Sequence, residues 1–101
     1  MKSLRLILVL AVLLAASPLL AADATVRIRR GGFAPAAARV APGDSVTWVN
    51  ADDRDHSIDG GDFRSGTLKP GASFTHRFAR PGRYAISCPL HPRESMAVIV
   101  E

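Results

Sequence analysis

The sequence is poor in cysteine, methionine and aromatic residues. It contains one cysteine, one tryptophan, one tyrosine, four phenylalanines and two methionines. A single cysteine excludes an internal disulfide, although small exported domains are usually stabilised by disulfides or by a metal ion. If the chain is exported, a lone thiol in an oxidising compartment therefore points to metal ligation.

Three other patterns are missing from the sequence. No stretch shows the 3.6-residue periodicity of an amphipathic helix, and there is no internal repeat or low-complexity tract. The formal net charge is +4, but the basic residues are scattered and do not alternate with aromatics, which argues against nucleic-acid binding. A mild positive charge favours association with acidic partners.

The chain opens with the pattern of a cleavable signal peptide over residues 1–22. A lysine and an arginine precede an unbroken apolar run at 6–16, and cleavage is predicted between residues 21 and 24. The alternative is an uncleaved membrane anchor, but about 17 apolar residues are short for a span of about 20. We expect export to the periplasm or a similar compartment, no stable membrane insertion, and a single domain over residues 25–101.

Short strands are predicted between closely spaced proline and glycine residues. Alternation of apolar and polar residues, or enrichment in β-branched residues, marks each of them. The segments are 25–30, 36–40, 45–50, 56–58, 73–79, 83–88 and 95–101. Short strands with turns at this spacing predict an all-β fold, an antiparallel sandwich.

Candidate metal donors are concentrated near the C-terminus. Cys88, His91 and Met96 offer a thiolate, an imidazole and a thioether, which belong to the donor set of a mononuclear electron-transfer copper site. Such a site needs a second imidazole, and His56 can supply it. Because alternate residues of a strand share a face, His56, Cys88 and Met96 are predicted on the buried side of their strands.

His76 competes with His56 for the position of the second imidazole. It lies between Phe74 and Phe78 on the predicted inner face of its strand, where a single histidine is more often a packed core residue than a ligand. Its strand runs between two Pro-Gly turns, so we expect His76 in mid-strand and away from the end loops. His56 is therefore the preferred ligand.

The segment from about Thr25 to Glu101 resembles the cupredoxins, the small blue copper proteins, and in particular the plastocyanin, amicyanin and pseudoazurin group. The resemblance rests on GDSVTWVN at 43–50, DHSI at 55–58, GTLKPG at 66–71, PGRY at 81–84 and the loop Cys88-x2-His91-x4-Met96. This loop has the length seen in plastocyanin-like members, whereas Leu90-His91-Pro92 is similar to amicyanin-type loops, which are often two residues shorter. The resemblance implies a Greek-key sandwich, one copper ion and electron transfer.

Two positions depart from the pattern of this family. Ser57 follows the first ligand histidine, where many members have an asparagine that ties the two ligand segments together. Ser87 precedes the cysteine, where plastocyanins have a tyrosine that offers a remote route for electrons. The first change is expected to affect the rigidity of the ligands, and the second removes that electron route.

The predicted function is the transfer of single electrons between redox partner proteins, such as a cytochrome or a copper or quinone enzyme, by a monomer. The copper ion would cycle between the Cu(I) and Cu(II) states. His56, Cys88 and His91 would bind it strongly, and Met96 would be the weak axial ligand. The apolar residues around His91 would form the electron port.

The same residues are compatible with other functions. The main alternative is a periplasmic Cu(I) carrier or scavenger without redox turnover, and another is a metal-free interaction domain. Zinc is disfavoured because structural zinc sites rarely recruit methionine. A Cys–His hydrolase lacks an orienting third group, so we expect no enzyme.

Overall fold

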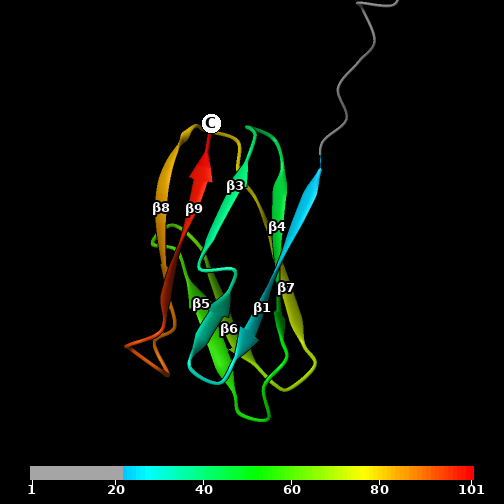
Figure 1. Cartoon of the computed structure of the whole chain (residues 1–101), viewed down its shortest axis with the longest axis vertical. Helices are drawn as coiled ribbons and strands as arrows, with labels where there is room; N and C mark the ends of the chain where they lie inside the picture. The colour runs from blue at the N-terminus through cyan, green and yellow to red at the C-terminus, as the bar shows by residue number, and fades with distance from the viewer. Residues whose placement is uncertain (1–21) are drawn as a thin grey trace, which may run out of the picture.

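Two packed β-sheets form the body of the computed structural model, which describes residues 22–101 (Figure 1). In these residues there are nine strands and no helix, so no helix that could cross a membrane is found among them. The all-β prediction is confirmed. The predicted signal peptide lies almost wholly outside the described residues.

The strands divide into a four-stranded and a five-stranded sheet. In the first, the order is β2 (Gly32–Ala34), β1 (Asp23–Arg29), β4 (Ser45–Asn50) and β7 (Ser73–Arg77). In the second, the order is β3 (Ala37–Val40), β9 (Ser95–Val100), β8 (Gly82–Ser87), β5 (His56–Asp59) and β6 (Arg64–Leu68).

The prediction of a purely antiparallel sandwich is wrong, because each sheet contains one parallel pair. β1 runs parallel to β4 and β3 runs parallel to β9, while the other pairs are antiparallel. Parallel neighbours need a long crossover connection, and the chain makes it by leaving one sheet and returning. Turn spacing locates the ends of strands, but it does not tell which strands become neighbours.

Two strands were not predicted from the sequence. β2 has only three residues, and β6 contains Gly66 and shows no regular alternation of apolar side chains. Both are edge strands, where a strand is held by hydrogen bonds to one neighbour. Their formation therefore depends on that neighbour more than on their own composition.

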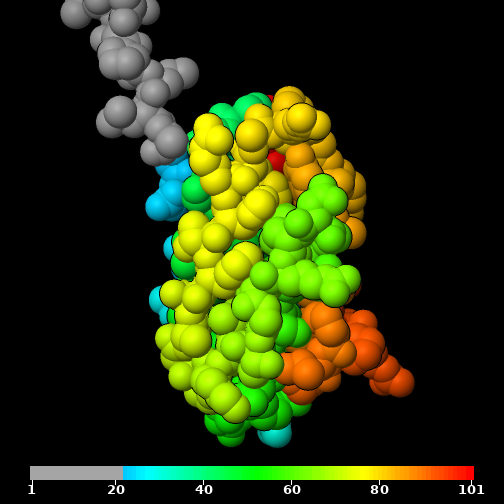
Figure 2. Space-filling view, turned by 180° about the vertical axis from the view of Figure 1, so that it is seen from behind, coloured from blue at the N-terminus to red at the C-terminus, as the bar shows by residue number. Residues whose placement is uncertain are grey.

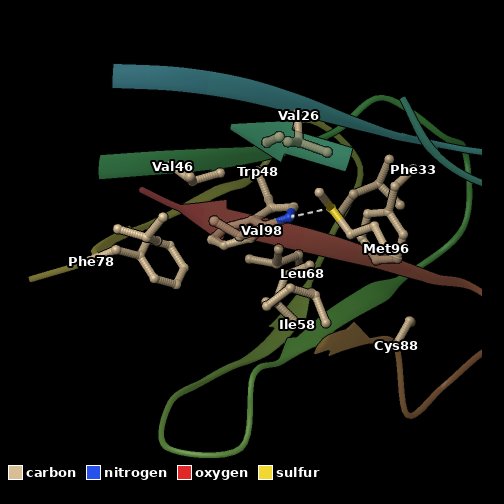
Figure 3. Packing of buried hydrophobic residues seen from close by; sticks show 14 residues of the cluster. Val26, Phe33, Val46, Trp48, Ile58, Leu68, Phe78, Cys88, Met96 and Val98 are labelled. Atoms are coloured by element: carbon tan, nitrogen blue, oxygen red, sulfur yellow. Dashed lines mark hydrogen bonds between the residues drawn. The ribbon is translucent and has the colours of Figure 1, made fainter. Parts of the chain in front are cut away.

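Trp48 lies at the centre of the core between the two sheets (Figure 3). Its side chain is fully buried, and its ring centroid lies 6.1–6.4 Å from those of Phe63, Phe74 and Phe78. The indole N–H has a partner as well, because Trp48 Nε1 donates to Met96 Sδ at 3.3 Å. Burial of so large a ring anchors both sheets.

Strand parity is tested most directly by substitutions on β1. Ile28 is fully buried, whereas its neighbour Arg27 is exposed. We expect Ile28→Ala to lower the free energy of unfolding by about 2–5 kcal/mol, through lost burial and the cavity left behind. Arg27→Ala should change it by about 0.5 kcal/mol or less. Urea denaturation monitored by Trp48 fluorescence measures both, and equal losses would contradict the assignment of faces.

Candidate metal centre

Two loops bring the candidate ligands to one end of the sandwich, the lower end in Figure 1. His56 begins β5 after the loop at 51–55, while Cys88 and His91 belong to the loop between β8 and β9. This second loop, orange in Figure 2, stands out from the body of the molecule. Residues that are far apart in the sequence therefore meet beside an exposed loop.

Backbone hydrogen bonds fold the loop between β8 and β9 into two successive turns. The His91 N–H donates to Cys88 O at 2.9 Å, and the Glu94 N–H donates to His91 O at 2.8 Å. A third bond, from the Cys88 N–H to Glu94 O at 3.3 Å, closes the loop. The closed loop returns Glu94 to Cys88, so that the donor atoms of these two residues lie within 4.8 Å of each other.

A buried asparagine shapes the other loop. The Asn50 amide donates to the carbonyls of Arg54 and Leu68, each at 2.8 Å, and its oxygen accepts from the Asp52 N–H at 3.0 Å. These bonds satisfy a side chain that is 1% exposed. They also fold the segment after β4 so that the Asp52 carboxylate faces His56.

Cys88 is fully buried, and its sulfur receives hydrogen bonds from the start of β5. The backbone N–H of Ser57 donates to Cys88 Sγ at 3.3 Å, and the Ser57 hydroxyl lies 3.8 Å from the same atom. Since the shorter contact comes from the backbone, it does not require an asparagine side chain at position 57. The serine therefore retains a link between the two ligand segments.

The Nε2 atom of each histidine forms a hydrogen bond to an oxygen acceptor, and this bond orients the ring. His56 Nε2 lies 2.8 Å from Asp52 Oδ2, and this hydrogen bond holds the pKa of the Asp52 carboxyl well below its usual range. His91 Nε2 donates to the carbonyl of Asp55 at 3.0 Å. Because a neutral imidazole carries one N–H, Nδ1 of each ring keeps its lone pair for a metal ion.

The two imidazole rings are neighbours. Their centroids lie 4.6 Å apart with 43° between the planes. His56 is fully buried, whereas His91 is partly exposed. The structure therefore brings two predicted ligands together by their donor atoms, His56 and Cys88. His91 lies beside them through its ring contact with His56, but its nitrogens are not among the donor atoms that lie within 4.8 Å of one another.

Glu94 is a site residue that the sequence interpretation missed. The donor atoms of His56, Cys88 and Glu94 all lie within 4.8 Å of one another. Glu94 is 7% exposed, and its Oε1 lies 3.0 Å from His56 Nδ1 without the geometry of a hydrogen bond. The burial of Glu94 could have been predicted from strand parity, because Glu94 lies two residues before Met96 and so extends the buried face of β9.

Met96 and His76 have other partners. Figure 3 shows the Met96 sulfur directed at the indole nitrogen of Trp48, so the axial role of Met96 stays a prediction. His76 stacks on Phe63, with ring centroids 3.7 Å apart, and meets Phe78 edge-on. Burial lowers the pKa of His76, although the charge of Asp62 opposes the shift. His76 is therefore a packed residue of the aromatic cluster.

The donor atoms present fit a copper ion. Atoms that bind one metal ion lie roughly 3–4 Å apart, because each is about 2.0–2.3 Å from the ion. His56 Nδ1 lies 3.9 Å from Cys88 Sγ and 3.0 Å from Glu94 Oε1. A thiolate combined with imidazoles suits copper. The buried Glu94 Oε1, which has no hydrogen-bond partner among residues 22–101, is a further donor for a cation.

The surface beside this site combines apolar and basic side chains. Leu90 is 50% exposed, an exception among the large apolar side chains of residues 22–101. It lies in a shallow hollow with His91, Pro92 and three arginines, Arg30, Arg54 and Arg93. The accessible ligand loop therefore presents an apolar centre with a positive rim.

The sequence and the fold are similar to those of known proteins. A protein from Rhizobium leguminosarum bv. viciae named "Putative pseudoazurin" is 32% identical over 106 residues, which cover 90% of this chain and 67% of the relative. A purple cupredoxin from Nitrosopumilus maritimus has 28% identity and a TM-score of 0.72, covering 78% of this chain and 100% of that one.

The fold is also that of amicyanin. The oxidised form of an amicyanin point mutant matches with a TM-score of 0.74 and 24% identity, covering 78% of this chain and 82% of that one. The family model described as "Cupredoxin-like domain" matches residues 4–100. The chain therefore belongs to the cupredoxin-like family, whose members are generally copper proteins that carry electrons.

Proposed function

We propose that the protein is a periplasmic type 1 copper protein that carries single electrons between redox partners. The observation that carries the proposal is the buried Cys88 sulfur 3.9 Å from His56 Nδ1, with Nε2 of both His56 and His91 held by oxygen acceptors. This arrangement supplies a thiolate and two imidazoles, which is the strong part of a blue-copper donor set. Export is supported by the leader pattern of residues 1–22.

The bound copper ion would supply a one-electron couple, and the protein would restrict how far its ligands move. Asp52 and the Asp55 carbonyl hold the two rings, and the Ser57 N–H holds the sulfur. Ligands that cannot rearrange reduce the structural change that accompanies each electron transfer. His56, Cys88 and His91 are the three strong ligands in this proposal.

The hollow around His91 is the proposed electron port. His91 is the accessible ligand, and Leu90 and Pro92 beside it offer apolar contact. The arginines around them favour partners with acidic surfaces, by accelerating encounter. Electron transfer at this surface does not require a substrate cleft, so we propose an electron carrier and not an enzyme.

The copper-loaded mature protein tests the proposed function. We expect an intense visible thiolate-to-Cu(II) band and a reversible one-electron couple, measured by absorption spectroscopy and voltammetry. Cys88→Ser should abolish the band, whereas Ser95→Ala, an exposed residue of β9, should leave it unchanged. A colourless protein that binds only Cu(I), without a reversible couple, would instead indicate a copper carrier.

The role of Asp52 in orienting His56 gives a second prediction. Asp52→Asn keeps the size of the side chain but removes the negative charge that accepts from His56 Nε2. We expect Cu(II) affinity to fall about 10–100-fold, as for other partners of ligand histidines. Asp53→Asn is the matched control, because Asp53 is exposed. Competition titration with a chelator measures both, and equal affinities for the two variants would reject the role.

The electron port is tested by replacing Leu90. Leu90→Gln should slow electron self-exchange roughly tenfold, the factor that corresponds to about 1.4 kcal/mol of lost contact. NMR line broadening measures the exchange rate. High salt is present during the measurement, so that repulsion between the arginines of two molecules is screened. The visible spectrum should not change, and Leu90→Met should exchange at the original rate. An unaltered rate in Leu90→Gln would exclude this surface as the port.

A further inference from the structure

The contact between Glu94 and His56 joins two atoms that both accept hydrogen bonds. His56 Nε2 lies 2.8 Å from Asp52 Oδ2, and a neutral ring that donates there has its lone pair on Nδ1. Glu94 Oε1 lies 3.0 Å from this Nδ1 and has no hydrogen-bond partner within residues 22–101. Two buried acceptors at this distance repel each other unless a cation lies between or beside them.

A proton on His56 Nδ1 is a poor solution to this repulsion. It would have to donate to Glu94 Oε1, but the contact lacks the alignment of a hydrogen bond. A metal ion has no such requirement, since it lies off the line that joins its ligands. Cys88 Sγ, 3.9 Å from the same Nδ1, provides a third donor on that side.

Glu94 is held in this position by the protein itself. Its backbone closes the ligand loop through Cys88 and His91. Its second carboxylate oxygen, Oε2, lies 3.7 Å from Arg54 Nη2, which also pairs with Asp52 Oδ2 at 3.0 Å. One oxygen of Glu94 is therefore compensated by an arginine, while the other remains available to a cation.

Met96 would have to break a buried hydrogen bond to take the same role. Its Sδ accepts from Trp48 Nε1 at 3.3 Å, and both side chains belong to the core. Rotation of the sulfur toward Cys88 would leave the buried indole N–H without a partner, which is unfavourable. Glu94 needs no such change, because its oxygen already lies beside His56 and Cys88.

We propose that Glu94 Oε1, and not Met96 Sδ, is the fourth donor of the metal centre. This inference rests on the proposed copper function and assigns a thiolate, two imidazoles and a carboxylate. The Cys88 and Glu94 anions together neutralise Cu(II), whereas with Cu(I) one negative charge remains in a buried site. A carboxylate is also a hard donor, while Cu(I) prefers soft ones. The centre therefore stabilises Cu(II) and has a lower reduction potential than a thioether-ligated site.

Voltammetry and EPR of the copper-loaded protein distinguish the two donors. Glu94→Met should lower the ratio of Cu(II) affinity to Cu(I) affinity about tenfold. This change raises the reduction potential by about 59 mV. Glu94→Gln, which keeps the shape of the side chain and removes the charge, should also raise the potential. Both variants should alter the copper hyperfine splitting. Met96→Leu is the matched control and should leave potential and splitting unchanged.

The opposite pattern would overturn the assignment of Glu94. If Met96→Leu shifts the potential while Glu94→Gln and Glu94→Met do not, the thioether is the ligand, and the copper function stands. If the unmodified protein shows no thiolate-to-copper band, the proposed function fails and this inference fails with it. Circular dichroism of each metal-free variant verifies the fold, and Glu94→Gln serves where Glu94→Met does not fold.

Discussion

The hydrogen bond between Asp52 and His56 Nε2 is the interaction on which the rest of the candidate metal centre depends. It fixes which nitrogen of the buried ring carries the lone pair, and therefore which atom faces Cys88 and Glu94. The bond exists because Asn50 folds the preceding loop by pairing with three backbone groups. A polar residue at the end of β4 thus determines the chemistry at the start of β5.

Strand parity accounts for what the sequence could predict. The period of two in β-strands placed His56, Cys88 and Met96 on the buried face, and all three are buried. The same rule placed His76 on the inner face, where it stacks on Phe63. Parity needs only a local pattern, so it holds even where the pairing of strands was predicted wrongly.

Features that depend on contacts between distant segments could not be predicted in this way. The parallel pairing of β1 with β4 and of β3 with β9 depends on which sheet the chain enters after each turn. The partner of Met96 depends on Trp48, which lies in the other sheet. Parity allows both Glu94 and Met96 on the buried face, and only the folded loop shows which of them reaches His56 and which reaches the core.

Arg54 contacts the buried carboxylates of the candidate site and also forms part of the positively charged surface beside it. Its guanidinium lies 3.0 Å from Asp52 and 3.7 Å from Glu94, yet its side chain remains 37% exposed and lines the hollow beside His91. The charge that compensates the buried carboxylates is therefore the same charge that a partner would meet. The carboxylates of Asp52 and Glu94 and the guanidinium of Arg54 thus form one electrostatic unit, in which the inner anions hold the outer cation in place.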